Sequence, residues 1–285
     1  SLSLSPITPM AIPQYKDFNK CALDILNDDF DYKNFLKVKS KAPNGVTLTT
    51  TTDFNCNGGK CSVGGKVAAK WAHESGFALD KLEVKNNGSV VVETSLSGVA
   101  PGLKFEFKGD DSNKGDLGAV YKTPQYTATA EVDVAEFSIA KGSILAGTGP
   151  YTGGASASLS LGDKVDVKSF DVAGSYAVAK NYFAGISVTN KFSKYALSFA
   201  YFGGSNYTLA GLFNFTPEKS ATSLTVGGLY KCNPKTNIKA KINSEGTLAV
   251  SVKQFLSSDC SVTAATELPT KDFSAYKFGI TASLG

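Results

Sequence analysis

Along most of the chain, hydrophobic and polar residues alternate with a period of two. Segments 103–108 and 126–134 show this clearly: apolar or small side chains occupy every second position, and charged or hydroxyl side chains occupy the positions between. The same pattern returns in 170–178, 207–215 and 276–284. Successive side chains of a β-strand point to opposite faces, so the period predicts strands of about 9–11 residues with one apolar face each.

Turn-forming residues separate these segments at regular intervals. Such residues gather at positions 43–45, 57–59, 86–88, 101–102, 203–206 and 245–246, and clusters of this kind typically connect strands. Counting the runs between them predicts about 19 strands from Phe35 to Gly285. No linker or change of composition divides the run, so we expect one all-β unit over residues 35–285.

Two features favour a membrane-spanning β-barrel over a soluble β-sandwich. The predicted strands match the roughly 9–11 residues that a tilted strand needs to cross a bilayer, and they exceed the usual length of soluble strands. Tyrosines also cluster at strand ends, where an interfacial girdle would lie. A helical membrane protein is excluded, because no apolar stretch approaches the roughly 20 residues of a transmembrane helix. The tyrosines at strand ends are Tyr121, Tyr126, Tyr151, Tyr182, Tyr195, Tyr201, Tyr207 and Tyr276.

Before the strands, residues 15–28 follow a helical period. Phe18, Ala22, Ile25 and Leu26 recur on one face, and charged residues occupy most of the remainder. This spacing predicts an amphipathic helix of about four turns, too short and too charged to cross a bilayer. Residues 1–13 are rich in serine and proline and form a predicted irregular extension, and residues 14–34 hold the helix and a hinge.

Three short motifs resemble the eukaryotic porins, the family of the mitochondrial voltage-dependent anion channels. Met10-Ala11-Ile12-Pro13, with Tyr15, Asp17 and Lys20 after it, is similar to the start of these channels. The segment 230–236, continued by 240–244, is similar to a C-terminal signature of the family, and Gly102-Leu103-Lys104 matches a triplet that the family places in a strand.

The resemblance covers nearly the whole chain, and it implies a pore in the mitochondrial outer membrane. Such a pore is voltage-gated and passes small ions and metabolite anions, nucleotides included. In this family the short helix lies inside the pore with its apolar face against the wall. The resemblance therefore implies packing and gating roles for Phe18, Ala22, Ile25 and Leu26, and a lumenal charge at Lys20.

The chain also departs from the family pattern. Asn233 stands where the signature usually has an acid. The hinge that is glycine-rich in many members is here the segment 29–34, which contains no glycine. A membrane-facing glutamate of some members falls near Lys81.

If the apolar parity of each strand faces lipid, the polar parity faces the lumen. A lumen of about 19 strands is wide enough to hold water, and an excess of lysines would raise the local anion concentration. Fewer acids share the predicted inward parity than lysines; these acids are Glu93, Glu106, Glu131, Asp133 and Asp171. The predicted lumenal lysines are Lys37, Lys39, Lys66, Lys70, Lys104, Lys108, Lys239, Lys241, Lys253 and Lys277.

Other chemistry finds little support in the sequence. The net charge of +4 is too small to indicate a nucleic-acid partner. One histidine and no nucleophile elbow or phosphate loop predict that the chain is not an enzyme, and we expect no catalytic residue, cofactor or metal. Cys56 and Cys61 are expected to be reduced thiols, with a bridge or a metal site as the less favoured interpretation.

Two other functions stay open at this point. One is a protein-import barrel of the same fold, although the lysine excess disfavours basic presequences as cargo. The other is a soluble β-rich binding protein. The expected partners of a pore are metabolite anions and the lipid bilayer, and assembly into a homo-oligomer or a larger mitochondrial complex stays open.

Overall fold

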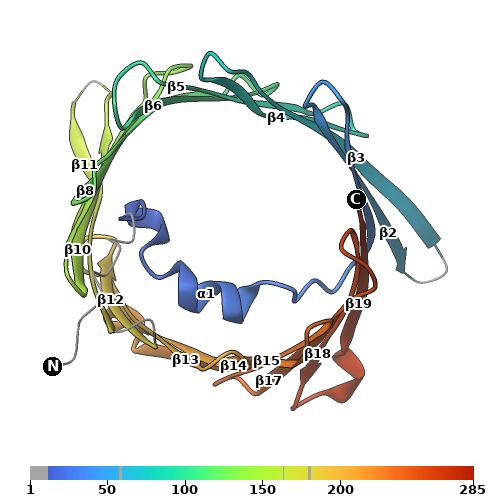
Figure 1. Cartoon of the computed structure of the whole chain (residues 1–285). Helices are drawn as coiled ribbons and strands as arrows, with labels where there is room; N and C mark the ends of the chain where they lie inside the picture. The colour runs from blue at the N-terminus through green and yellow to red at the C-terminus, as the bar shows by residue number, and fades with distance from the viewer. Residues whose placement is uncertain (1–11, 58–59, 163, 179–180) are drawn as a thin grey trace, which may run out of the picture.

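The chain forms one closed barrel of 19 strands with a helical segment inside it (Figure 1). The computed structural model describes residues 12–285 except 58–59, 163 and 179–180, so most of the predicted extension 1–13 lies outside the described residues. Neighbouring strands are antiparallel, except that β1 and β19 close the barrel as a parallel pair. The prediction of a 19-stranded all-β barrel is therefore confirmed.

The strands follow the alternating segments closely. They are β1 (Asn34–Lys41), β2 (Thr47–Asn57), β3 (Lys60–Ala72), β4 (Phe77–Lys85), β5 (Val90–Ser97), β6 (Leu103–Asp110), β7 (Gly115–Lys122), β8 (Tyr126–Asp133), β9 (Ile139–Thr148), β10 (Tyr151–Ser160), β11 (Asp166–Val178), β12 (Tyr182–Thr189), β13 (Lys194–Gly203), β14 (Tyr207–Thr216), β15 (Ala221–Asn233), β16 (Thr236–Asn243), β17 (Thr247–Phe255), β18 (Cys260–Pro269) and β19 (Lys277–Leu284).

The pairing of the strands determines which residues of each strand face the lumen. Lys239 and Lys241 bond to the helix in the lumen, so the odd positions of β16 face inward. Residues paired across a ladder share a face, and the paired residues carry this assignment from β16 in both directions back to the β1–β19 seam. Bulges shift the register in β4, β11 and β15 without reversing the faces elsewhere.

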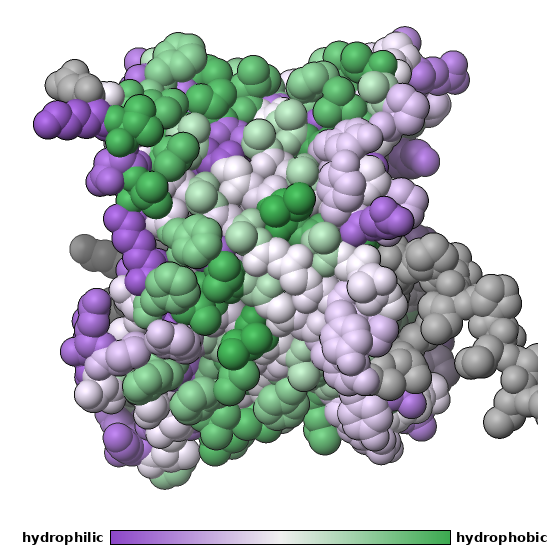
Figure 2. Space-filling view, turned by 90° about the vertical axis from the view of Figure 1, so that its left-hand side faces the viewer, coloured by the Kyte–Doolittle hydropathy of each residue, from purple (hydrophilic) through white to green (hydrophobic). Residues whose placement is uncertain are grey.

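The outer face of the wall is apolar. Large side chains of the outward parity are widely exposed, and Ile186 and Leu197 are each 51% exposed. Figure 2 shows one side of the barrel, with hydrophobic and weakly polar residues over its middle and strongly hydrophilic residues mainly toward its two ends. Such a surface is unfavourable in water by about 25 cal/mol per Å² of apolar area, and it fits the hydrocarbon core of a bilayer.

Tyrosines concentrate at one end of the barrel, which we call the tyrosine rim. There odd-numbered strands end and even-numbered strands begin. Tyr182 and Tyr201 lie 4.9 Å apart between ring centroids, as do Tyr151 and Tyr176. Of the predicted girdle, Tyr195 and Tyr276 lie at the opposite rim, and the ring of Tyr195 there is 6.3 Å from that of Phe215. The tyrosine rim thus carries a one-sided interfacial anchor along β7 to β15.

The predicted N-terminal helix is broken into two pieces inside the barrel. A 3₁₀ turn, η1 (Tyr15–Asp17), precedes the α-helix α1 (Lys20–Asn27). Asn19 between them is buried and has φ −113° and ψ 16°, which interrupts the helical hydrogen-bond ladder. The prediction of a single helix over residues 15–28 is therefore wrong in its first half. No helix in the described part of the chain is long and apolar enough to span a membrane.

Candidate functional site

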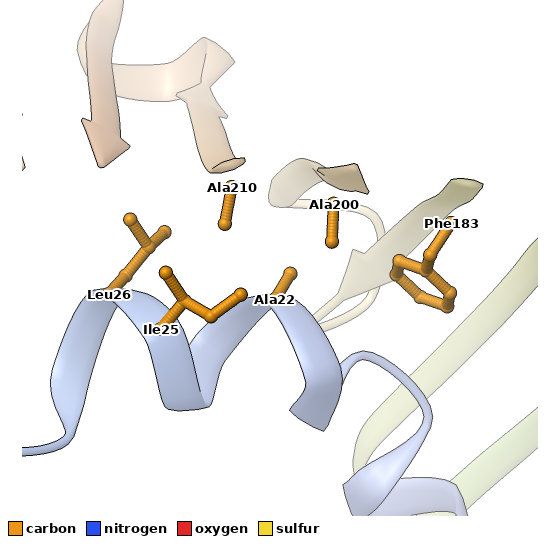
Figure 3. Packing of buried hydrophobic residues seen from close by; sticks show 6 residues of the cluster. All are labelled: Ala22, Ile25, Leu26, Phe183, Ala200 and Ala210. Carbon is orange, nitrogen blue, oxygen red and sulfur yellow. The ribbon is translucent and has the colours of Figure 1, made fainter. Parts of the chain in front are cut away.

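The helix α1 packs against a seat on the inner wall that combines small side chains with the ring of Phe183 (Figure 3). Ala22 and Leu26 are 0% and 1% exposed, and Ile25 is also buried. Their partners include Ala200 on β13 and Ala210 on β14. Burying a leucine or isoleucine side chain stabilises by about 1.5–3 kcal/mol, so this contact is enough to hold a short helix in a wet lumen.

A glycine allows the closest approach of helix and wall. A Cβ atom on Gly227 would lie 2.7 Å from the carbonyl oxygen of Ala240 and 3.0 Å from Cδ2 of Leu26. A side chain there would therefore push against both the neighbouring strand and the helix. The wall under α1 carries alanine and glycine because larger residues would fill the space that Leu26 occupies.

The first part of the N-terminal segment has a separate seat. Tyr15 and Ile12 form a second buried cluster with Leu145 and Ala173, and Phe18 packs at its edge. The Thr127 hydroxyl donates a 2.7 Å hydrogen bond to the carbonyl oxygen of Ile12. Phe18 was predicted on the same face as Ala22, Ile25 and Leu26. The break at Asn19 instead turns Phe18 toward this second cluster.

Wall lysines bond to the carbonyl groups at the C-terminal end of α1. The Lys239 ammonium donates to the carbonyl oxygens of Asp24 at 3.1 Å and Asp28 at 3.2 Å, and Lys241 donates to that of Leu26 at 2.6 Å. Carbonyl groups at this end of a helix carry the negative end of its dipole, and that of Asp24 also accepts a 3.2 Å hydrogen bond from the Asp28 amide. The last turn of α1 has no basic residue of its own, so the wall supplies the positive charge.

Asp29 in the hinge completes this arrangement. Its carboxylate lies 3.0 Å from Lys239 and 3.0 Å from Lys253, and its φ of 68° is left-handed, a conformation that glycine takes most easily. The Lys241 ammonium lies 4.3 Å from the ring centroid of buried Phe30. We call Asp29, Lys239, Lys241 and Lys253 the hinge clamp. It ties the hinge to the wall where many family members have flexible glycines.

The charge state of Asp29 follows from its surroundings. Burial alone would raise the pKa of this carboxyl, but the hydrogen bonds and positive charges of Lys253 and Lys239 outweigh burial and hold the pKa below its ordinary value of 3.8. A depressed pKa in the docked state means that the clamp is fully present above the ordinary pKa and is lost only as the pH falls through the lower docked value.

Replacing Asp29 by asparagine should loosen the hinge at every pH. Removing the carboxylate leaves Lys239 and Lys253 without their anion, at a cost of about 2 kcal/mol of docking free energy. We expect amide hydrogen exchange in α1 to become roughly thirtyfold faster in Asp29→Asn, since about 1.4 kcal/mol corresponds to a factor of ten. The wild-type protein should exchange alike at about pH 7 and pH 5, after correction for intrinsic rates, because Asp29 stays ionised at both. Equal protection in both proteins would show that the clamp does not hold the helix.

The predicted lumenal lysines all have the inward parity, and they fall into two groups. One group is engaged by acids or by the helix: Lys66 with Glu83 at 3.1 Å, Lys104 with Glu106 at 2.8 Å, Lys277 with Glu267 at 2.7 Å, and the three lysines of the hinge clamp. The other group makes no ion pair within the described part of the chain; on the wall it is Lys37, Lys39, Lys70 and Lys108, and on the helix it is Lys20.

The sequence analysis missed several lumenal groups, above all Glu83. This carboxylate is 4% exposed and lies 3.2 Å from Lys81. The β-bulge at Asp80 shifts the register of β4, so that Lys81 faces the lumen rather than lipid. A bulge leaves no mark in a simple alternation, so the pattern assigned β4 no lumenal charge.

The described residues contain no group of three or more histidine, cysteine, aspartate or glutamate side chains arranged to bind a metal ion. The side chains of Cys56 and Cys61 lie outside the described part, so the expectation of reduced thiols there stays a prediction. What the inner wall offers is a wet, lysine-rich passage beside a docked helix.

Solved structures similar in fold are bacterial porins. One engineered variant of the Rh. blastica porin superposes with a TM-score of 0.51 at 10% identity, covering 84% of this chain and 98% of that one. Another engineered variant of the same porin has a TM-score of 0.50 at 11% identity, with the same coverage of both chains. At this identity the likeness concerns the fold alone.

Sequence comparison is more specific. Mitochondrial outer membrane protein porin 2 of Arabidopsis thaliana is 25% identical over 95% of this chain and 97% of its own length. The non-selective voltage-gated ion channel VDAC2 of Meleagris gallopavo is 26% identical over 97% of this chain and 95% of its own. The family model of the eukaryotic porins matches residues 11–279. With that match over nearly the whole barrel, the chain belongs to the eukaryotic porin family.

Proposed function

We propose that this chain is a voltage-gated, weakly anion-selective channel that passes small ions and metabolite anions, nucleotides included, across the mitochondrial outer membrane. The observation that carries the proposal is the group of lumenal lysines without an ion pair among the described residues. Those on the wall lie on β1, β3 and β6, whereas α1 lies against β13 to β15 (Figure 1). Relatives in two plants and a fungus are named mitochondrial outer membrane porins, and this chain shares that membrane.

Selectivity in such a pore is modest. Ions keep their hydration shells in a wide lumen, and wall charges act over a Debye length of only about 10 Å at 0.1 M salt. Several of the predicted selectivity lysines are also neutralised by acids or by the helix. Free lysines remain in excess, and they favour chloride, phosphates and carboxylates over cations.

Voltage dependence is supported by the helix and its clamp. Moving one charge through the membrane field is worth about 2.3 kcal/mol per 100 mV. The helix segment rests on the wall through a small apolar seat and a few charged contacts. Its charged residues are Lys16, Asp17, Lys20, Asp24 and Asp28. A displacement of this segment under voltage would narrow the passage, which is the partial closure that we propose.

A planar-bilayer recording of the purified protein tests this function. We expect large pores whose reversal potential in a KCl gradient shifts modestly toward the chloride potential, and whose conductance falls partly at tens of millivolts. A protein that stays monodisperse without detergent and never conducts would instead be a soluble β-rich protein. A pore with cation preference would remove the anion-selective part of the proposal and would fit the import of basic peptides.

Reversing two free lysines should change ion preference without changing the pore's structure. Lys37 and Lys39 alternate with outward Val38 on β1, and both are exposed to the lumen. In Lys37→Glu with Lys39→Glu, two positive charges beside the path become negative, so the reversal potential should move toward the potassium potential. Val38→Thr with Ile242→Thr changes outward residues and is the matched control. An unchanged reversal potential in the lysine variant would contradict the lumenal assignment.

A further inference from the structure

The charges of the inner wall are divided between the two halves of the pore axis. Odd-numbered strands run toward the tyrosine rim and even-numbered strands run away from it. The place of an inward residue within its strand therefore tells which half of the lumen it occupies. We call these the tyrosine half and the opposite half.

The tyrosine half is strongly basic. Among described wall residues of inward parity, its acids are Asp80 and Glu106, and both contact the same lysine, Lys104, at 3.6 and 2.8 Å. Lys239 and Lys253 in this half are taken by Asp29. The remaining lysines make no ion pair with described residues; they are Lys39, Lys41, Lys70, Lys122 and Lys231.

The opposite half is nearly balanced. Carboxylates there offset the lysines, and three of them form ion pairs: Glu83 with Lys66, Glu131 with Lys141 at 2.7 Å, and Glu267 with Lys277. Further acids of this half have the inward parity without an ion pair among the described residues; they include Glu93, Asp116 and Asp171. The excess of positive charge is thus confined to the tyrosine half.

We propose that this axial division makes the pore a rectifier whose tyrosine rim collects anions, small multivalent phosphates and carboxylates above all. When the compartment at the opposite rim is positive, anions leave the basic half and cations approach it from the balanced half. Cations are repelled at the boundary, so salt accumulates inside the pore and conductance rises. Reversing the voltage depletes salt at the same boundary. The inference rests on the proposed channel function and adds to it the voltage polarity at which the current is larger.

Salt concentration sets the size of the effect. At 0.1 M salt each half of the pore is about as long as the Debye length, so the wall charge still determines which ions are inside. At 1 M the Debye length is about 3 Å, so each half is several Debye lengths long and the wall charge is screened. We therefore expect a current ratio of about 1.5 between opposite voltages of equal size at 0.1 M KCl, and a ratio near 1 at 1 M.

The test is a single-channel current–voltage curve at voltages too small for closure, with the orientation of each channel known. Biotin on Ser205→Cys, in a protein without native cysteines, marks the tyrosine rim, since Ser205 lies in the turn between β13 and β14. Streptavidin added afterwards to one compartment perturbs only channels whose tyrosine rim faces it. The larger current should flow when the other rim is positive.

Two matched variants separate the location of charge from its amount. Lys70→Gln with Lys122→Gln and Lys231→Gln removes three free lysines of the tyrosine half, and the current ratio should fall toward 1. Lys37→Gln with Lys85→Gln and Lys108→Gln removes the same charge from the opposite half, and the ratio should rise. A symmetric curve in an anion-selective wild-type pore, or equal shifts in both variants, would overturn the axial division and leave the channel function intact. A protein that forms no pore would overturn both.

Discussion

Replacing Leu26 by aspartate should detach α1 from the wall while the barrel still assembles. Leu26 is 1% exposed and packs with Ile25 and Ala22 against Ala210. Loss of this side chain alone costs about 2–5 kcal/mol, and a carboxylate in the same space adds the cost of an unpaired buried charge. This cost is comparable to what burial of Ile25 and Leu26 contributes to docking, about 1.5–3 kcal/mol each, so we expect the helix to leave the seat. Single-channel recordings should then show changed voltage dependence and more open-state noise.

A surface position of the same helix provides the control. Asn27 is exposed on α1, so Asn27→Asp adds the same charge without entering the seat. It should leave closure nearly unchanged, and circular dichroism should report an intact barrel in both variants. Unaltered gating in Leu26→Asp would mean that the docked helix does not belong to the gating machinery.

Reversing two lysines of the hinge clamp should also act mainly on the helix. In Lys239→Glu with Lys241→Glu, carboxylates would face Asp29 and the carbonyl end of α1, where ammonium groups now donate at 2.6–3.2 Å. Lys239 is 9% exposed, so the new charges would be poorly solvated. We expect voltage-dependent closure to be disrupted, with at least about tenfold faster amide exchange in α1, since about 1.4 kcal/mol corresponds to a factor of ten.

The matching change elsewhere on the wall separates this effect from net charge. Lys277→Glu breaks the 2.7 Å pair with Glu267 at the opposite rim, and the structure gives Lys277 no bond to the described residues of α1. That variant should shift the reversal potential toward potassium with little effect on exchange in the helix. Equal effects on gating and exchange from both variants would mean that these lysines act on the pore's overall field and not on the hinge.

Much of the fold followed from the alternation of side chains. In a wall one residue thick, lipid requires one face to be apolar and water permits the other to be charged, so parity alone assigned the lumenal lysines to one face. The exceptions are local. The bulge at Asp80 and the break at Asn19 are backbone irregularities that no period reveals. The first left the lumenal charges of β4 unassigned, and the second misplaced Phe18.

The hinge clamp could not be predicted from the sequence, for a different reason. Asp29 and Lys253 are 224 residues apart in sequence, and their contact depends on where α1 rests in the closed barrel. One signal was visible: the hinge lacks the glycines that many family members have, and an aspartate occupies a left-handed backbone position instead. The sequence showed that the hinge is unusual, but only the structure shows which wall lysines hold it in place through charged contacts.

The channel function depends on ions passing between α1 and the free lysines of the wall. The most direct measurement is single-channel conductance of Lys20→Cys, in a protein whose five native cysteines are replaced by serine, before and after modification by an anionic thiol reagent. Lys20 is exposed on the lumenal helix, so modification should be complete from either side, lower the conductance and weaken anion preference. A fully modified protein with unchanged conductance and reversal potential would contradict this function, because the helix would then lie away from the conducting path.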